Sequence, residues 1–385
     1  MCNNLKNLFF LAVLSFLCNA NAQVNFSNRL VIVSAVEPVC MEINDKYGIL
    51  AVGTKSTADQ LIVYKLNDDG LLGEQTQKIT YKKDDFLAAY PLFTGGLVFH
   101  PSLPVLYVWR DIRNINVGSA GEQYVYNHFE HGAVYEITNG NLREVLSFAS
   151  GSNYMYGIIY GTPPSYSSLA VDYTGRRLFV PNLRVPSNGQ TVIGYFDLDE
   201  KGMPVPLPVP IPGTLDGYGV NKYEKKLIPV EVNVHSIRPY VSGLGMVASS
   251  PTTVVFSASQ GFGLWDTENR MGTLGYFAIV GVGDHWICSH PSLNTIFGAA
   301  INSHLLFRIT HSDGYFTLMP QLKWSISGMQ FQCRPVVIPG KPAYLAAGGT
   351  AQIVIHKIDA EEKLTDEGMS IIGCALPIKA LAWSE

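Results

Sequence analysis

The chain has 385 residues, with 27 basic and 31 acidic side chains and a formal net charge of −4. Its Lys and Arg residues are scattered, with no block longer than a pair, which excludes a surface that attracts nucleic acid or an anionic membrane. After residue 22 no apolar stretch approaches the roughly 18 residues that span a bilayer, so we expect a soluble mature chain.

The first 22 residues have the pattern of a signal peptide. Lys6 provides a basic start, residues 8–18 form a short apolar run, and Ala20-Asn21-Ala22 is a small-x-small cleavage site. We therefore expect a secreted or periplasmic protein that is cleaved near Ala22. Lipidation of Cys18 is an alternative, although Leu17 stands where a lipobox has Gly, Ala or Ser.

The mature chain, 23–385, contains a repeated pattern rather than helical periodicity. Each unit has an apolar strand, a turn centred on Pro, Asp or Gly, a second hydrophobic strand, a polar loop and a third strand. Six such units follow one another, at residues 40–72, 95–142, 167–203, 243–266, 285–316 and 331–364.

The spacing of these units predicts an all-β fold, a β-propeller in a single domain. The last three units begin about 44 residues apart, the period of a four-stranded blade. Residues 29–35 and 378–385 each supply one further strand, so we expect the N- and C-terminal strands to close the ring. Six units and one shared unit favour seven blades of four antiparallel strands; six or eight stay open, because residues 204–240 blur the count.

The repeats resemble those of the lactonase-type, YVTN-like seven-bladed propellers, the superfamily of the 6-phosphogluconolactonases. The likeness lies in the turn-and-strand segments HPSLPVLYV, DYTGRRLFV and HPSLNTIFG, at residues 100–108, 172–180 and 290–298. It also includes the closing segments LIVYKLNDDGLL and VIGYFDLDEKGM, at 61–72 and 192–203. The resemblance covers most of the mature chain and is a likeness of fold, which hosts many functions.

Four cysteines remain after the signal peptide: Cys40, Cys288, Cys333 and Cys374. They are widely spaced and include no CxxC pair, so neither a zinc site nor a redox motif is indicated. One disulfide and buried free thiols both fit the sequence.

In propellers, the loops that enter the inner strands surround one mouth of the central channel. Ligand sites usually form at that mouth. In this chain those loops, together with the second-to-third strand loops that reach the same end, are rich in aromatic residues and carry a few cations. Aromatic rings stack on sugars, and Arg pairs with carboxylate or phosphate, so the set suits a small polar organic ligand. The candidate substrate-binding residues are Arg184, Tyr166, Tyr240, Arg110, Trp324 and Asn182. For each aromatic residue, filling the channel is an equally good interpretation.

The resemblance implies a catalytic role for His285, because a His commonly opens an inner strand in lactonase-type propellers. It would bind a lactone or transfer a proton beside Asp284, while Arg238 or Arg184 steadies a carboxylate or oxyanion. The acidic residue usual in the following loop is replaced here by Asn302-Ser303-His304. A structural histidine bonded to neighbouring backbone is therefore the competing interpretation.

Other polar residues have simpler explanations. His100 and His290 each precede Pro in a blade turn, and Asp172 occupies the same position, which predicts turn capping. His128 and His131 could bind a metal only if their loop folds back. The Asp-rich segments 68–70 and 197–202 lack the ligand pattern of a calcium loop. We predict neither a metal nor a cofactor.

Two functions follow from this sequence. The first is a lactonase-like hydrolase of a small sugar-derived or cyclic ester at the channel mouth. The second is a non-catalytic scaffold that binds a protein, peptide or glycan through its long loops, including the Tyr-rich stretch 154–166. Neither involves nucleic acid, nor a membrane once the signal is removed.

Overall fold

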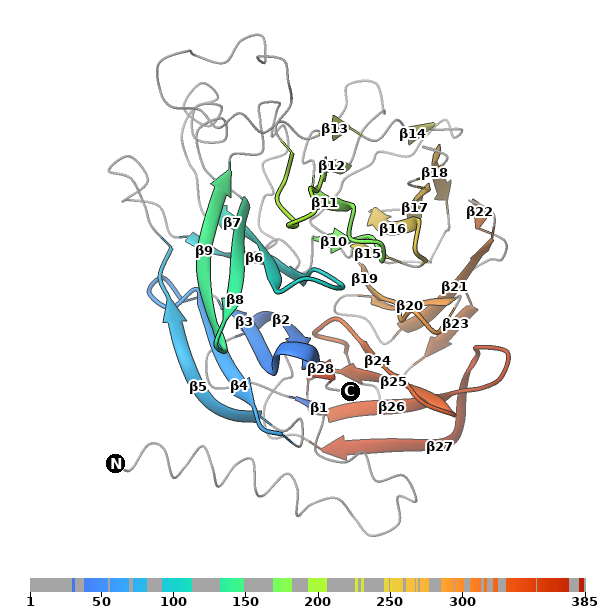
Figure 1. Cartoon of the computed structure of the whole chain (residues 1–385). Helices are drawn as coiled ribbons and strands as arrows, with labels where there is room; N and C mark the ends of the chain where they lie inside the picture. The colour runs from blue at the N-terminus through green and yellow to red at the C-terminus, as the bar shows by residue number, and fades with distance from the viewer. Residues whose placement is uncertain are drawn as a thin grey trace, which may run out of the picture.

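The chain folds into β-sheets arranged around a common centre (Figure 1). The computed structural model describes residues 30–31, 38–54, 56–68, 72–81, 92–112, 132–148, 169–181, 193–205, 226–227, 230–231, 246–248, 250–258, 261–266, 268, 271–276, 285–293, 295–300, 305–312, 315–316, 321–324, 330–350, 352–373 and 381–383. Among these residues, no helix is long and apolar enough to cross a membrane.

The described residues form six sheets of four or five strands and one two-stranded sheet. The first three sheets consist of β2 (Pro38–Asn44), β3 (Ile49–Thr54), β4 (Leu61–Leu66) and β5 (Leu72–Ile79); β6 (Leu92–Phe99), β7 (Val105–Ile112), β8 (Gly132–Thr138) and β9 (Asn141–Phe148); and β10 (Ala170–Val171), β11 (Arg177–Pro181), β12 (Ile193–Asp197) and β13 (Lys226–Leu227).

The next three sheets follow the same plan with two additions. They consist of β14 (Val230–Glu231), β15 (Met246–Ala248), β16 (Thr253–Ala258), β17 (Gly261–Asp266) and β18 (Met271–Tyr276); β19 (His285–Cys288), β20 (Thr295–Ala300), β21 (Leu305–Ser312), β22 (Tyr315–Phe316) and β23 (Gln321–Trp324); and β24 (Val336–Ile338), β25 (Ala343–Gly348), β26 (Gln352–Ile358) and β27 (Leu364–Gly373). Pairing is antiparallel throughout, except that β14 adds to β18 in parallel.

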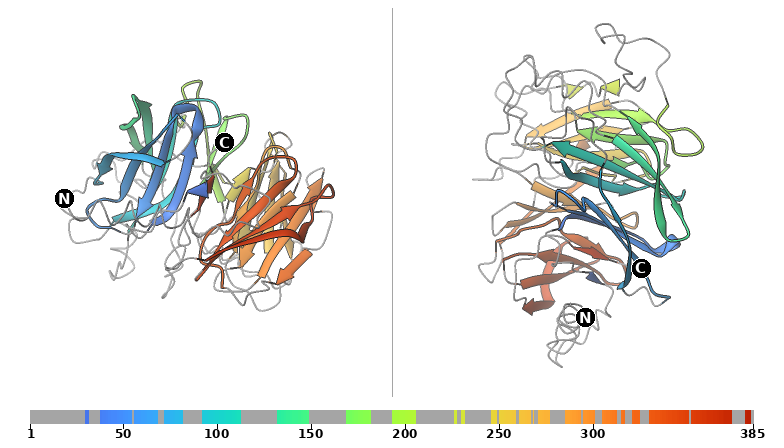
Figure 2. Two further views of the ribbon diagram at one scale, coloured as in Figure 1. Left: turned by 90° about the horizontal axis from the view of Figure 1, so that it is seen from below. Right: turned by 90° about the vertical axis from the view of Figure 1, so that its left-hand side faces the viewer.

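The sheets follow one another around the ring in chain order, so the fold is an all-β propeller. One strand of each sheet lies next to the centre, namely β2, β6, β10, β15, β19 and β24 in the six sheets, whereas β14 lies at the outer edge of the fourth sheet (Figure 1). Among these inner strands, β2 contacts β6, β6 contacts β10, β10 contacts β15, and β15 contacts β19. The turned views in Figure 2 show the sheets packed beside one another. Each sheet buries its faces only against its neighbours, which is why one unit could not fold alone.

The ends of the chain meet as predicted. In the two-stranded sheet, β1 (Leu30–Val31) pairs antiparallel with β28 (Ala382–Trp383), and β28 contacts both β2 and β24. Ala382 packs with the apolar cluster of the first sheet, while Leu381 packs with that of the sixth. The closing sheet thus lies between the first and sixth sheets. Seven full blades stay a prediction, because only two strands of this last sheet fall in the described residues.

The core lies between neighbouring sheets. Every residue of β3 is buried, because this strand has an adjacent sheet on both faces. One apolar cluster joins Ile49 and Val63 of the first sheet to Leu106 and Tyr135 of the second. Strands buried on both faces explain why the segment ILAVGT is apolar without alternation.

Turns at the ends of the inner strands are held by their own side chains, as predicted. His100 Nδ1 accepts hydrogen bonds from the N–H groups of Ser102, at 3.1 Å, and Leu103, at 3.0 Å. His290 Nδ1 accepts from Ser292 N–H at 3.2 Å. Asp172 Oδ1 accepts from the N–H group of Arg176 at 3.0 Å. These side chains replace the backbone partners that a tight turn leaves out.

Segments that follow the third strand of a sheet tie the third sheet to the second and the sixth sheet to the fifth. Tyr107 on β7 donates its hydroxyl to the carbonyl of Gly202 in the hairpin after β12, at 2.8 Å. Arg308 on β21 donates to the carbonyl of Glu361 in the hairpin after β26, at 2.7 Å. The same contact in two places shows that the repeat extends to the way the sheets join.

Candidate functional site

Two pairs of polar side chains, from four different sheets, lie on the innermost strands or directly beside them at the centre of the ring. They are Glu42 on β2, Tyr173 just after β10, Ser289 just after β19, and Arg334 just before β24. Figure 1 shows all four of these strands next to the centre. We call these four residues the central cluster.

The contacts within the central cluster join sheets that are not neighbours in the ring. Arg334 Nη1 donates to Glu42 Oε1 at 2.9 Å, which links the sixth sheet to the first past the closing strands. The hydroxyls of Tyr173 and Ser289 are 3.2 Å apart, which links the third sheet to the fifth past the fourth. Such contacts are possible only across the middle of the ring.

Solvent reaches this part of the ring. The side chain of Glu42 on β2 is 26% exposed, that of Arg334 just before β24 is 28% exposed, and Tyr173 and Ser289 are also partly exposed. The backbone contributes as well, because Arg334 Nε donates to the carbonyl of Ile287 at 3.0 Å. The cluster therefore offers charged, hydroxyl and carbonyl groups to a small molecule at the centre.

Burial opposes ionisation of the acidic groups here. It raises the pKa of Glu42, while the charge of Arg334 and the hydrogen bond from it act against that rise. Burial also raises the pKa of Tyr173, and the Ser289 hydrogen bond and the Arg334 charge oppose it. Burial raises the pKa of Cys288 to about 12, so this thiol is a poor nucleophile at neutral pH.

Two residues of the central cluster, Ser289 and Tyr173, lie toward the end of the ring opposite the predicted mouth, whereas Glu42 lies within β2 and Arg334 precedes β24. Ser289 follows the last residue of β19, and Tyr173 comes two residues after the end of β10, so both lie where inner strands finish. In these antiparallel sheets, the loops that enter the inner strands and the second-to-third connections leave the other end. The sequence analysis placed the candidate ligand site at that other end.

Among the predicted site residues, Arg110 is the one whose side chain the structure describes. It lies on β7, is 3% exposed, and donates from Nη2 to Glu144 Oε2 at 2.5 Å and to the hydroxyl of Tyr135 at 2.9 Å. Its guanidinium also lies 4.8 Å from the ring centroid of Tyr81. The charge of Arg110 is thus matched inside the first and second sheets, and a ligand would have to displace Glu144 to use it.

The backbone positions of two further predicted residues are described. His285 is the first residue of β19, the innermost strand of its sheet, as the resemblance implies. Trp324 is the last residue of β23, which pairs with β21 on the side away from β19 and β20. Asp284, Arg238, Arg184, Tyr166, Tyr240 and Asn182 lie outside the described residues, and their roles stay predictions.

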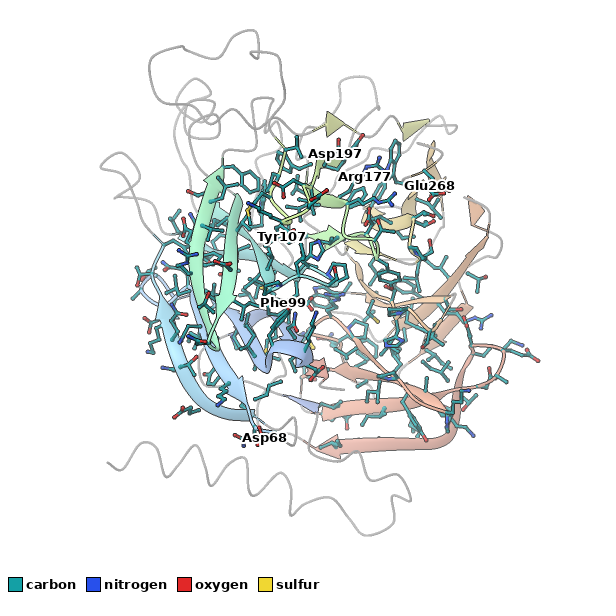
Figure 3. The ribbon with its side chains drawn as sticks, in the orientation of Figure 1. Asp68, Phe99, Tyr107, Arg177, Asp197 and Glu268 are labelled. Carbon is teal, nitrogen blue, oxygen red and sulfur yellow. The ribbon has the colours of Figure 1, made fainter. Side chains whose placement is uncertain are left out.

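The described residues hold no group of three or more His, Cys, Asp or Glu side chains that could bind a metal. Asp199 Oδ1 accepts hydrogen bonds from the N–H groups of Lys201 and Met203, at 2.8 Å each, which makes this segment a hairpin turn. Asp197 pairs with Arg177 on the adjacent strand at 3.2 Å, and both are labelled in Figure 3. His128 and His131 lie outside the described residues.

Cys40 and Cys288 are free and buried, and Cys333 is buried as well. This agrees with the free-thiol alternative for Cys40 and Cys288, whereas Cys374 is outside the described residues. Burial favours the neutral thiol of Cys40, because it raises the pKa. These thiols contribute to packing between sheets.

Sequence reasoning missed Glu42 and Arg334 because each is a single charged residue in an unremarkable segment. Their signal is positional: both interrupt apolar runs, VCMEIN and FQCRPVV, that the repeat assigns to inner strands. A charge at such a position faces either a neighbouring sheet or the centre of the ring. Searching the aligned units for charged residues on the inner strand would have found both.

Comparisons with known proteins support the fold. No family model matches the chain, and no curated protein matches it. Among solved structures, a protein from Lactobacillus plantarum has a TM-score of 0.56 and 10% identity, covering 92% of this chain and 90% of its own. A putative 6-phosphogluconolactonase from Bacteroides uniformis has a TM-score of 0.51 and 13% identity, covering 84% and 82%.

The WD40 repeats of RRP9 are similar as well, with a TM-score of 0.54 and 8% identity, covering 93% of this chain and 88% of that one. At such low identities these similarities show the propeller fold alone, which lactonase-like and WD40 structures share.

Proposed function

We propose that this protein is an exported, lactonase-like propeller that binds a small sugar-derived or cyclic ester along its ring axis and hydrolyses it. The observation that carries the proposal is the position of His285 as the first residue of β19, the innermost strand of its sheet, at the end where the loops enter the inner strands. Small-molecule sites in propellers can form there from a few convergent polar groups between otherwise apolar walls.

In the proposed reaction His285 is the general base. It accepts a proton from water as the water oxygen bonds to the ester carbonyl carbon, and Asp284 orients the imidazole. Arg238 stabilises the oxyanion. The ring C–O bond then breaks as protonated His285 returns its proton to the leaving oxygen, which releases a hydroxy acid and restores the neutral base. The position of His285 at the start of an inner strand supports this role. Arg184, Tyr166, Tyr240, Asn182 and Trp324 would hold the substrate.

The test is turnover of a panel of lactones by the purified mature chain, followed as acid release in a pH-stat. His285→Ala should lower kcat/KM by a factor of about 10² to 10⁴, the usual contribution of a general base. His290→Ala is the matched control, since His290 caps a turn at the other end of the same inner strand. Equal rates for His285→Ala and the unchanged protein would refute the hydrolase.

A non-catalytic scaffold for a protein, peptide or glycan is the second candidate. Long connections favour it: residues 113–131 join β7 to β8 and residues 149–169 join β9 to β10, and both leave the same end of the ring. The fold shared with WD40 repeats agrees with this function. Shortening both connections should abolish capture in a pull-down or glycan array, and unchanged capture would contradict it.

Export is part of the proposal. The pattern of residues 1–22 supports cleavage after Ala22 and release to the periplasm or the medium. Amino-terminal sequencing of the exported protein should begin at Gln23. Retention of the full leader in a cytoplasmic fraction would contradict this part of the proposal.

A further inference from the structure

The charges of the central cluster balance. Glu42 and Arg334 form one ion pair with 2.9 Å between Oε1 and Nη1, and the other two side chains, Tyr173 and Ser289, are hydroxyls. An anionic ligand that pairs with Arg334 would have to displace Glu42 and leave its carboxylate without its partner. Leaving one member of a partly buried ion pair without its partner has a cost that offsets what an anion would gain from Arg334.

The same groups are well suited to hydroxyl ligands. The Glu42 carboxylate has the capacity to accept further hydrogen bonds from the hydroxyls of a ligand, the Arg334 guanidinium to donate further ones, and the hydroxyls of Tyr173 and Ser289 to donate and accept. The Tyr173 ring adds an aromatic face of the kind that stacks on sugar rings. Because the groups come from separate sheets, they can surround a small molecule.

We propose that the central cluster is a binding site for an uncharged, hydroxyl-rich small molecule, such as a neutral sugar or its lactone, and that Glu42 makes the site reject anions. This inference deepens the proposed function, on which it rests for the substrate class. It names a selectivity determinant, Glu42, on the inner strand β2.

Saturation-transfer NMR and calorimetric titration of the mature chain test the proposal. The probes are neutral hexoses, the matching uronic acids and the matching hexose 6-phosphates. At least one neutral hexose should bind, and its two anionic counterparts should bind at least tenfold more weakly. Tighter binding of the anions, or binding of no neutral sugar in the panel, would overturn the proposal.

The variant Glu42→Gln gives the sharpest result. It frees the charge of Arg334, so the ratio of anion affinity to neutral-sugar affinity should rise at least tenfold. A purely structural ion pair would change both affinities together, or neither, and leave the ratio unchanged. Tyr173→Phe removes one hydroxyl only and should weaken the neutral sugar at least fivefold with little loss of melting temperature; unchanged affinity would contradict its role.

Glu136→Gln is the matched control, because it removes the acid of an ion pair with Arg143 on the outer strands of the second sheet. It should leave both affinities as they are. Binding by His285→Ala separates the two proposals. If the protein binds neutral sugars but no form of it hydrolyses a lactone, the hydrolase is refuted and the binding site stands. If it hydrolyses lactones but shows no preference for neutral sugars, the binding site is refuted and the hydrolase stands.

Discussion

The close approach of Gly175 to His100 allows a quantitative test of how the second and third sheets join. Gly175 has φ +71°, and a Cβ atom added there would lie 2.3 Å from His100 Cε1 and 2.5 Å from His100 Nε2. Its carbonyl oxygen also lies 3.1 Å from His100 Nε2 in a hydrogen bond. Gly175→Ala therefore disturbs both the backbone and the contact between sheets.

The expected destabilisation is the sum of two effects. An L-residue in the left-handed region costs about 1–2 kcal/mol. Overpacking a buried contact costs about 1–3 kcal/mol more. Gly175→Ala should thus lower the free energy of unfolding by about 2–5 kcal/mol.

Gly140→Ala separates these effects. Gly140 has φ +75°, and a Cβ atom there would meet nothing within 4 Å. This variant should show the backbone cost alone, about 1–2 kcal/mol. Any entropy change in the unfolded chain is the same for both substitutions, so it cancels in the comparison.

The assay is urea denaturation followed by tryptophan fluorescence. It compares the single variants Gly175→Ala, Gly140→Ala and His100→Ala with the double variant that combines Gly175→Ala and His100→Ala. The Gly175 and His100 substitutions should show a coupling energy of at least about 1 kcal/mol, because the two residues are in contact. If Gly175→Ala lowers the free energy of unfolding by no more than Gly140→Ala does, the packing of this turn against the preceding sheet is refuted.

Three further predictions concern buried polar groups. Glu144→Gln removes the charged partner of the buried Arg110 and should lower the free energy of unfolding, measured by urea denaturation, by about 1–3 kcal/mol. Glu136→Gln, in an exposed ion pair, should lower it by less than about 0.5 kcal/mol. Equal losses for the two variants would contradict this account. Burial lowers the pKa of His100 below its ordinary value of 6.5, because it disfavours the charged imidazolium. The contribution of His100 to the free energy of unfolding is therefore fully present above pH 6.5 and is lost as the pH falls through the lower pKa of the folded state. The urea midpoint of the unchanged protein should fall on acidification, and that of His100→Gln should fall less steeply. Parallel pH profiles for the two proteins would refute this prediction. Because burial raises the pKa of Cys288 to about 12, a thiol reagent at pH 8 should modify this residue only after the protein unfolds. Mass spectrometry of the labelled peptide measures the modification. Rapid labelling of Cys288 in the native protein would contradict the prediction.

The candidate site could be predicted from the sequence only in part. The repeat places His285 at the start of an inner strand, and the structure has it there as the first residue of β19. Arg110 was expected at the mouth because it ends a strand beside a loop. The structure shows its guanidinium turned into the sheets and matched by Glu144 and Tyr135, a partnership between strands that no local pattern reveals.

The fold itself follows from local signals. Apolar strands, turn-forming residues and capping side chains such as His100 and His290 recur at fixed offsets, and each acts within a few residues of its own position. These features determine that sheets of this kind form and that they must stack to bury their faces. The closing strands could also be predicted, because each terminal segment is an unfinished unit.

Only the closed ring decides what meets at the centre. Glu42 and Arg334 are 292 positions apart in the chain, and Tyr173 and Ser289 are 116 apart. Nothing near these residues indicates their partners, since their separation is set by the number, twist and stacking of all the sheets between them. The sequence alone therefore determined the propeller, whereas the central cluster exists because the ring closes and brings the inner edges of distant sheets to one axis.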